Sequence, residues 1–222
     1  MNDAHRLVIF GVSNILSDIF DCALANGLRL GKVVIHHQEE IGDRDVSLAD
    51  RLQALGKQPP EVQNLCDFSP SENEIYLLGP TTPTRAELAR ELSAHFALSF
   101  HTLVHPTAYV SPLASLGVGT FVGANSVIGP GASLAEHVFV NRGVTIGHDT
   151  RIGPFSRIQP GSNLGGLSTI GQGVTIGIGA TLIERLTVGD HAFIGAGAVV
   201  INDVPASTLV LGVPAKVKKT LN

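Results

Sequence analysis

The chain has 222 residues, of which 44% are hydrophobic and 15% are charged, and its formal net charge is −4. This length suits two modest domains, and the sparse charge gives no electrostatic reason to expect binding to nucleic acid or an anionic membrane. We expect no membrane span, since no apolar run approaches about 18 residues, no signal peptide, and reduced thiols at Cys22 and Cys66 in a cytoplasmic protein.

The N-terminal part alternates strands and helices. Residues 6–12 form an apolar strand, Ser13 can cap a helix, and Gly27 can end that helix. A second apolar strand at 32–36 completes a strand–helix–strand unit, which implies a small parallel sheet. The alternation continues with a helix at 47–55, a strand at 74–79 and a helix at 85–96. The pattern predicts a small α/β domain over residues 1–102.

The turn after the first strand is Gly11-Val-Ser-Asn-Ile-Leu16. A glycine-rich turn at a helix N-terminus can hold phosphate with its backbone amides. Only one glycine is present here, so the dinucleotide fingerprint fails and NAD-dependent chemistry is not expected. A serine-capped helix start and a ligand contact at this turn both stay open.

A six-residue period dominates the rest of the chain. Every sixth residue is Leu, Ile or Val, and the next residue is Gly in ten of the seventeen hexads. The aliphatic positions are 104, 110, 116, 122, 128, 134, 140, 146, 152, 158, 164, 170, 176, 182, 188, 194 and 200. This repeat predicts a β-helix over 103–205 in which three hexads form one coil, so residues n and n+18 are vertical neighbours. A tail, 206–222, follows.

Polar residues that interrupt the repeat are the candidates for chemistry. His148, at the third position of its hexad, should project away from the core, and an imidazole can accept a proton at neutral pH. Asp149 follows it, although adjacent strand residues point to opposite faces, so Asp149 can also act through the backbone or on another subunit. Gly166 lies one coil above, where an exposed amide could bind an oxyanion. The alternatives without function are that His148 is a solvated surface histidine and that the two glycines at 165 and 166 only allow the chain to turn.

The other histidines give no metal site. His137 and His191 share a column but lie three coils apart, and no three histidines fall on adjacent coils. His36 and the following histidine end the second strand, where a loop can contact substrate as readily as form a surface pair. No metal is therefore expected, which argues against a metal-dependent hydratase.

Three segments resemble a known family: IGAGAVVINDVP at 194–205, GVPAK at 212–216 and VNRGVTIGHD at 140–149. Together with the N-terminal α/β domain, they make the chain similar to the left-handed β-helix acyltransferases with hexapeptide repeats. Within these, it resembles the sialic acid O-acetyltransferases and the bacterial UDP-4-amino-sugar N-acetyltransferases. The resemblance implies a left-handed helix, acetyl-CoA as co-substrate, and a homotrimer with CoA between adjacent prisms.

The resemblance also implies roles for individual residues. His148 matches the general base, Asp149 the acid that raises its basicity, and Gly166 the amide that receives the thioester oxygen. The positions matched to CoA binding are Arg157, Ile178, Ala196 and Lys216. The positions matched to acceptor binding are Gly11, Ser13, Asn14, His36 and Gly79.

Departures from the family pattern lie mostly in the acceptor domain. The first turn lacks the usual histidine, His36-His37 replaces an acidic pair, Pro80 follows Gly79 where the family has Asn, and Arg157 replaces a histidine. We expect an acetyltransferase that N-acetylates a nucleotide-linked amino sugar for bacterial surface glycans. An O-acetyltransferase acting on sialic acid or another sugar, and a non-catalytic scaffold, are the alternatives.

Overall fold

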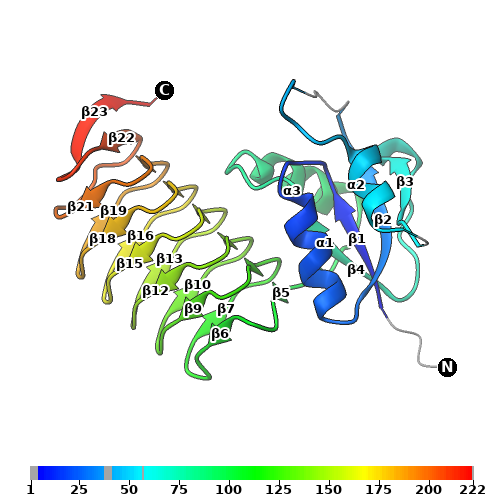
Figure 1. Ribbon diagram of the computed structural model, residues 1–222, viewed down its shortest axis with the longest axis horizontal. Coiled ribbons are helices and arrows are strands. Elements are labelled where there is room, and N and C mark those ends of the chain that lie inside the picture. Colours follow the sequence, from blue (N-terminus) through cyan, green and yellow to red (C-terminus); the bar gives the residue numbers. More distant parts are fainter. Residues whose placement is uncertain (1–4, 38–41, 57, 222) are drawn as a thin grey trace. The chain divides into compact units, whose positions relative to one another are not determined.

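The computed structural model describes residues 5–37, 42–56 and 58–221. The chain divides into two compact units (Figure 1). The first contains the residues up to Thr81 together with Glu87–His101, and the second contains Thr82–Ala86 and the chain from Thr102 onward. Among the described helices, none has the length and apolar character that crossing a bilayer requires.

The first unit is a four-stranded parallel sheet with helices, in the order β3-β2-β1-β4. The strands are β1 (Arg6–Phe10), β2 (Arg29–Ile35), β3 (Glu61–Asn64) and β4 (Glu74–Leu78). The helices are α1 (Leu16–Ala25), α2 (Leu48–Ala54) and α3 (Arg85–His95), with a 3₁₀ turn at Leu65–Asp67. The inner strand β1 is buried along nearly its whole length, as its unbroken apolar sequence predicts for a parallel sheet.

Two sequence-based expectations in this unit were wrong. Ser13 does not cap α1; the helix has Ile15 at its N-cap, and Ser13 Oγ donates a hydrogen bond to the Gly79 carbonyl, 2.7 Å away. The strand β3 was not expected, because its sequence EVQN is polar and mostly exposed at the sheet edge. By contrast, the helix expected at 47–55 is present as α2, with Ser47 at its N-cap accepting from Asp50 N at 3.1 Å, and Gly27 follows α1 with φ +69°, as expected for its end.

The second unit is the predicted β-helix. It consists of two-residue strands, each with one aliphatic residue of the six-residue series at its second position. They are β5 (Leu103–Val104), β6 (Tyr109–Val110), β7 (Ser115–Leu116), β8 (Phe121–Val122), β9 (Val127–Ile128), β10 (Ser133–Leu134), β11 (Phe139–Val140), β12 (Thr145–Ile146), β13 (Arg151–Ile152), β14 (Arg157–Ile158), β15 (Asn163–Leu164), β16 (Thr169–Ile170), β17 (Thr175–Ile176), β18 (Thr181–Leu182), β19 (Thr187–Val188), β20 (Phe193–Ile194) and β21 (Val199–Val200).

Strands pair with the strands one coil above and below. Ile146 pairs with Leu164 and Leu164 with Leu182, so the 18-residue coil is confirmed. From β5 to β21 every third strand joins the same parallel sheet, and with the tail strands the three walls have five, eight and six strands, of which only the last strand of the eight pairs antiparallel among the described residues. The eight-stranded wall includes β22 (Thr208–Leu211) and β23 (Lys216–Thr220), so the tail extends the β-helix.

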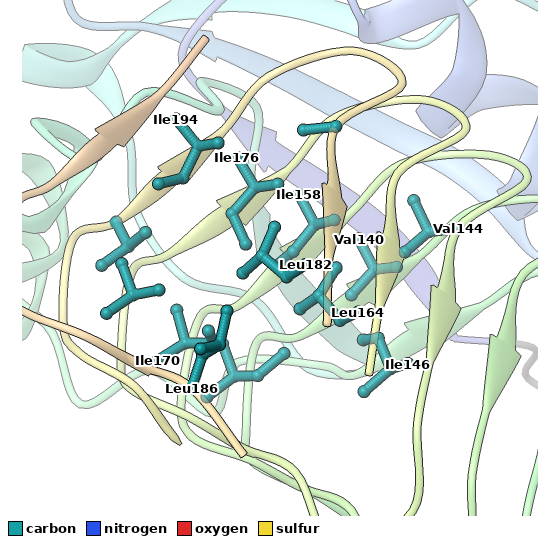
Figure 2. Packing of buried hydrophobic residues seen from close by; sticks show 14 of the residues in the cluster. Val140, Val144, Ile146, Ile158, Leu164, Ile170, Ile176, Leu182, Leu186 and Ile194 are labelled. Carbon is teal, nitrogen blue, oxygen red and sulfur yellow. The ribbon is translucent and has the colours of Figure 1, made fainter. Parts of the chain in front are cut away.

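The interior of the β-helix is a stack of aliphatic side chains (Figure 2). Ile146, Ile158 and Ile176 are each at most 2% exposed, and full burial of such a side chain contributes about 1.5–3 kcal/mol. Buried hydroxyls at the corners donate to carbonyls of the next coil, as Ser156 Oγ does to Gly171 O at 2.8 Å. Because these hydroxyls are hydrogen-bonded, they can be buried beside the aliphatic stack.

Candidate active site

His148 lies at the corner between β12 and β13, with its side chain 57% exposed. Its Nδ1 is 2.9 Å from Asp149 Oδ2, so the two neighbours do meet. The reason is the backbone: Asp149 has φ +55°, a left-handed turn that breaks the strand alternation, and its N–H donates to Pro130 O. Asp149 thus occupies one ring nitrogen of His148, which leaves Nε2 for a ligand.

Gly166 lies directly beside this imidazole. A Cβ built on Gly166 would come within 2.7 Å of His148 Nε2 and 2.8 Å of Cδ2, closer than van der Waals contact allows. Only glycine therefore lets the ring take this position without a shift. Among the residues that the structure describes, no carbonyl accepts the Gly166 N–H, whereas the next amide, Leu167 N–H, donates to His148 O.

This corner combines two groups that acyl transfer requires. Nε2 of His148 can take a proton from a nucleophile, and Asp149 on Nδ1 can orient the ring and stabilise the imidazolium that forms. The unused Gly166 N–H can donate to an oxygen that gains negative charge. The imidazole is exposed at this corner, whereas Gly166 is buried beside it, so a substrate would reach the amide alongside the His148 ring.

Ile178 and Ala196 lie at a different corner, between the eight-stranded and the six-stranded wall. Both are exposed, Ile178 by 60%, and they occupy the same third hexad position as His148 and Gly166. Their amides, like that of Gly166, have no carbonyl acceptor in the described part of the chain. Within one copy, these two residues and the His148 corner lie on separate edges of the β-helix.

Arg157 and Lys216 belong to the eight-stranded wall, in β14 and β23. Lys216 is exposed, whereas Arg157 is half-buried and donates from Nε to Thr175 Oγ1 at 3.1 Å. Burial lowers the pKa of Arg157 below its ordinary value. These two residues therefore also lie away from His148 in a single copy.

Arg85 is a residue that sequence reasoning missed. It is only 4% exposed, and its guanidinium donates to His137 O and Ser156 O of the β-helix and lies 5.9 Å from the Phe155 ring. Burial, and then the charge of Arg157, lowers the pKa of Arg85 to about 9. Nothing in a helix-forming sequence distinguishes this arginine from a solvated one.

In the first unit, the residues predicted from strand ends come together. A Cβ on Gly79 would clash with the Gly11 carbonyl, and a Cβ on Gly11 would clash with Pro80 and with His36 Cε1. Ser13 joins them through its bond to Gly79 O. Asn14 does not join this group; its amide donates to Asp45 Oδ1 at 2.8 Å.

A pocket of about 810 Å³ opens beside these residues, at the carboxyl ends of β2 and β3. Its lining includes His36, His37, Phe68, Glu91 and Phe96, the last two from or next to α3. Burial, and then the neighbouring His37, lowers the pKa of His36, while Glu91 acts in the opposite direction. Ligand sites commonly occur at this edge of a parallel sheet. Sequence reasoning found only the histidines.

The donor set does not favour a resident metal ion. In the described residues, no group of three or more His, Cys, Asp or Glu side chains is arranged to hold one. His137 is buried and stacks on Phe155 at 5.0 Å, and His191 lies three coils farther along its column, as expected.

Comparisons with known proteins agree with this architecture. Residues 168–202 match the family model described as bacterial transferase hexapeptide (six repeats). The acetyltransferase domain of PglB from Neisseria gonorrhoeae, solved with acetyl coenzyme A, matches with a TM-score of 0.81 and 29% identity. The match covers 97% of this chain and 100% of that chain. The comparison with curated proteins gives no match.

Two further solved structures are similar. A mutant of perosamine N-acetyltransferase from Caulobacter crescentus, in complex with CoA and GDP-perosamine, matches with a TM-score of 0.80 and 26% identity over 96% of each chain. WeeI from Acinetobacter baumannii has a TM-score of 0.73 at 19% identity and covers 97% of this chain and 100% of its own. At that identity, the second match supports the fold alone.

Proposed function

We propose that the chain, an acetyl-CoA-dependent acyltransferase with hexapeptide repeats, N-acetylates a nucleotide-linked amino sugar destined for a bacterial surface glycan. The observation that carries the proposal is the corner where the His148 imidazole, held by Asp149, lies over the Gly166 amide. The similar perosamine enzyme binds GDP-perosamine with CoA, which supports an acceptor of this class.

The reaction is a direct attack. The acceptor amine attacks the thioester carbonyl of acetyl-CoA while His148 Nε2 takes its proton, and the Gly166 N–H donates to the carbonyl oxygen as charge develops. The carbon–sulfur bond then breaks and CoA leaves as the thiolate. A general base contributes about 10²–10⁴ in rate and an oxyanion donor about 10²–10³, and the remainder comes from positioning of both substrates.

A second copy of the chain completes the site. Ile178 and Ala196 present free amides to CoA, but they lie on another edge of the β-helix than His148. Packing of two prisms edge to edge brings the His148 corner of one copy to the Ile178 corner of the next. Three prisms close this contact into a cyclic trimer. Arg157 and Lys216 then contribute positive charge to the CoA side.

The acceptor binds the first unit. Gly11, Ser13, His36 and Gly79 meet at the carboxyl edge of its sheet, where α/β proteins bind nucleotides. Gly11 and Gly79 are buried, and their amides donate to Val34 O and Phe10 O, so they shape this edge of the sheet rather than contact the acceptor through free backbone. Asn14, through Asp45, holds the turn in place rather than contacting the acceptor.

The test is His148→Asn, assayed by release of free thiol from acetyl-CoA with nucleotide-linked amino sugars as acceptors. We expect turnover to fall at least 100-fold while CoA binding, measured by isothermal titration, persists. His191→Asn is the matched control, because His191 is likewise an exposed histidine at a turn of the β-helix. Near-normal turnover of His148→Asn would refute the role of the base, and failure of the wild type to bind CoA would favour a scaffold.

A further inference from the structure

We propose that the pocket of the first unit selects guanine, with Glu91 as the residue that reads the base, so that the acceptor is a guanine-nucleotide sugar. This inference rests on the proposed function, because it takes the acceptor to be a nucleotide-linked sugar. It names the base, which the acetyl-transfer chemistry on the β-helix does not specify.

The pocket has the form of a base site. Its volume of about 810 Å³ is enough for a nucleoside, and it lies at the carboxyl ends of β2 and β3. The apolar part of its lining includes Leu65, Phe68, Leu92 and Phe96, and the two phenyl rings contact each other edge to face at 5.2 Å, so they form one aromatic surface. A planar heterocycle can stack on such a surface, which leaves recognition to the few polar groups at the edge.

Glu91 supplies the only carboxylate among the described residues that line the pocket. It lies on α3 next to the fully buried Leu92, and its backbone carbonyl is 2.9 Å from His95 Nδ1, which ties the end of the helix together. The side chain is close enough to His36 for its charge to act on that imidazole. Glu91 therefore lines the pocket from α3, whereas His36 lines it from the end of β2.

An ionised carboxylate is an acceptor only, and its two oxygens suit two adjacent N–H donors. Guanine offers this pair on its N1–H and N2–H₂ edge. Uracil has one N–H between two carbonyl oxygens that the carboxylate repels, and in adenine and cytosine the amino group adjoins an acceptor nitrogen. Glu91 therefore favours guanine over the other three bases.

The histidines complement this choice. His36 Nδ1 is buried and has no hydrogen-bond partner in the described part of the chain, and His37 lies 4.2 Å away, ring to ring, at the exposed side. An imidazole N–H is a donor, and guanine carries its acceptors, O6 and N7, on the edge away from N2. Donors from β2 and an acceptor from α3 thus match the two edges of one base.

The experiment is titration calorimetry of the full chain with GDP, IDP, UDP and ADP, without acetyl-CoA. Inosine lacks only the N2 amino group of guanine, so IDP removes one of the two donors. We expect GDP to bind about 10- to 100-fold more tightly than UDP and ADP, with IDP between them. Glu91→Gln should abolish the GDP preference over IDP. Glu87→Gln, one turn earlier on α3 and outside the pocket lining, should leave the order of the four nucleotides unchanged.

Several results would overturn the inference: UDP or ADP binding as tightly as GDP, no nucleotide binding at all, or an unchanged GDP preference in Glu91→Gln. Thiol release measured in parallel separates this from the proposed function. Acetyl transfer to a UDP-amino sugar but not to a GDP-amino sugar would sink the guanine assignment and leave the transferase intact. Absence of thiol release with every acceptor, despite selective GDP binding, would instead refute the transferase.

Discussion

The contact between Gly166 and the imidazole of His148 allows a sharp steric test. Gly166→Ala adds one methyl group and keeps the backbone N–H that is proposed to bind the thioester oxygen. Gly166 does not have a positive φ, so alanine fits the backbone without strain. The substitution therefore perturbs the position of the imidazole and leaves both the fold and the amide donor in place.

The size of the effect follows from the distances. The new Cβ would lie 2.7 Å from Nε2, whereas ordinary van der Waals contact begins at 3.4 Å, so the ring must move by about 0.7 Å. Misplacement of a reacting group by about 1 Å lowers rate by roughly 10²-fold. We expect kcat to fall between about 30- and 100-fold, with little change in CoA affinity or in Tm.

The assay is steady-state thiol release, with Tm from calorimetry. Gly27→Ala is the control, since its Cβ would meet nothing within 4 Å and it lies just after α1, outside the proposed CoA and acceptor sites. With φ +69° at Gly27, that variant should lose about 1 kcal/mol of stability but keep its turnover. A Gly166→Ala enzyme within about threefold of the wild-type kcat would show that the imidazole does not act from this position.

Three further predictions follow from the same geometry. If the site is shared by two copies, His148→Ala and Ala196→Trp are each inactive, but refolding them together in equal amounts restores about a quarter of wild-type turnover; no recovery would place the site within one copy. Burial lowers the pKa of His137 to about 4, so as the pH falls the unfolded chain protonates this histidine before the folded chain does. The free energy of unfolding should therefore fall by roughly 2 kcal/mol from pH 6.5 to pH 5. Urea unfolding of His137→Gln should show a smaller loss over the same pH range. Burial raises the pKa of the Cys22 thiol to about 12 while Cys66 is exposed, so Ellman's reagent should modify one thiol per native chain and two in denaturant.

The β-helix could be predicted from sequence because its rule is local. Each hexad places one aliphatic residue inside, and the same requirement recurs in every coil, so a period of six appears in the sequence itself. The vertical order of His148 and Gly166 follows from that period alone. Strand β1 and the Ser47 cap were likewise predictable, since a buried apolar run and an N-cap serine are local signals.

Features that depend on tertiary packing could not be predicted. The six-residue period does not predict the left-handed backbone conformation of Asp149. This conformation brings the Asp149 carboxylate to His148. Arg85 can be buried because two carbonyls of the β-helix, both far from it in the sequence, accept hydrogen bonds from its guanidinium. Glu91 joins His36 only because α3 packs beside the ends of β2 and β3. Each of these depends on residues more than 50 positions apart or on a single backbone angle.

The corners of the β-helix explain why this fold can carry ligands at all. At the third hexad position the chain turns, and the amide there is not needed to hold the coil: proline, which has no N–H, occupies this position at 106, 112, 130, 154 and 160. At Gly166, Ile178 and Ala196 the amide has no carbonyl acceptor among the described residues, whereas the Arg142 and Gln172 amides donate to Asn141 Oδ1 and Asp190 Oδ1. In the proposed function, backbone recognition of CoA is a property of the coil geometry, whereas acetyl transfer depends on the His148 imidazole. It follows that His148→Asn should separate the two, with CoA affinity retained and turnover lost.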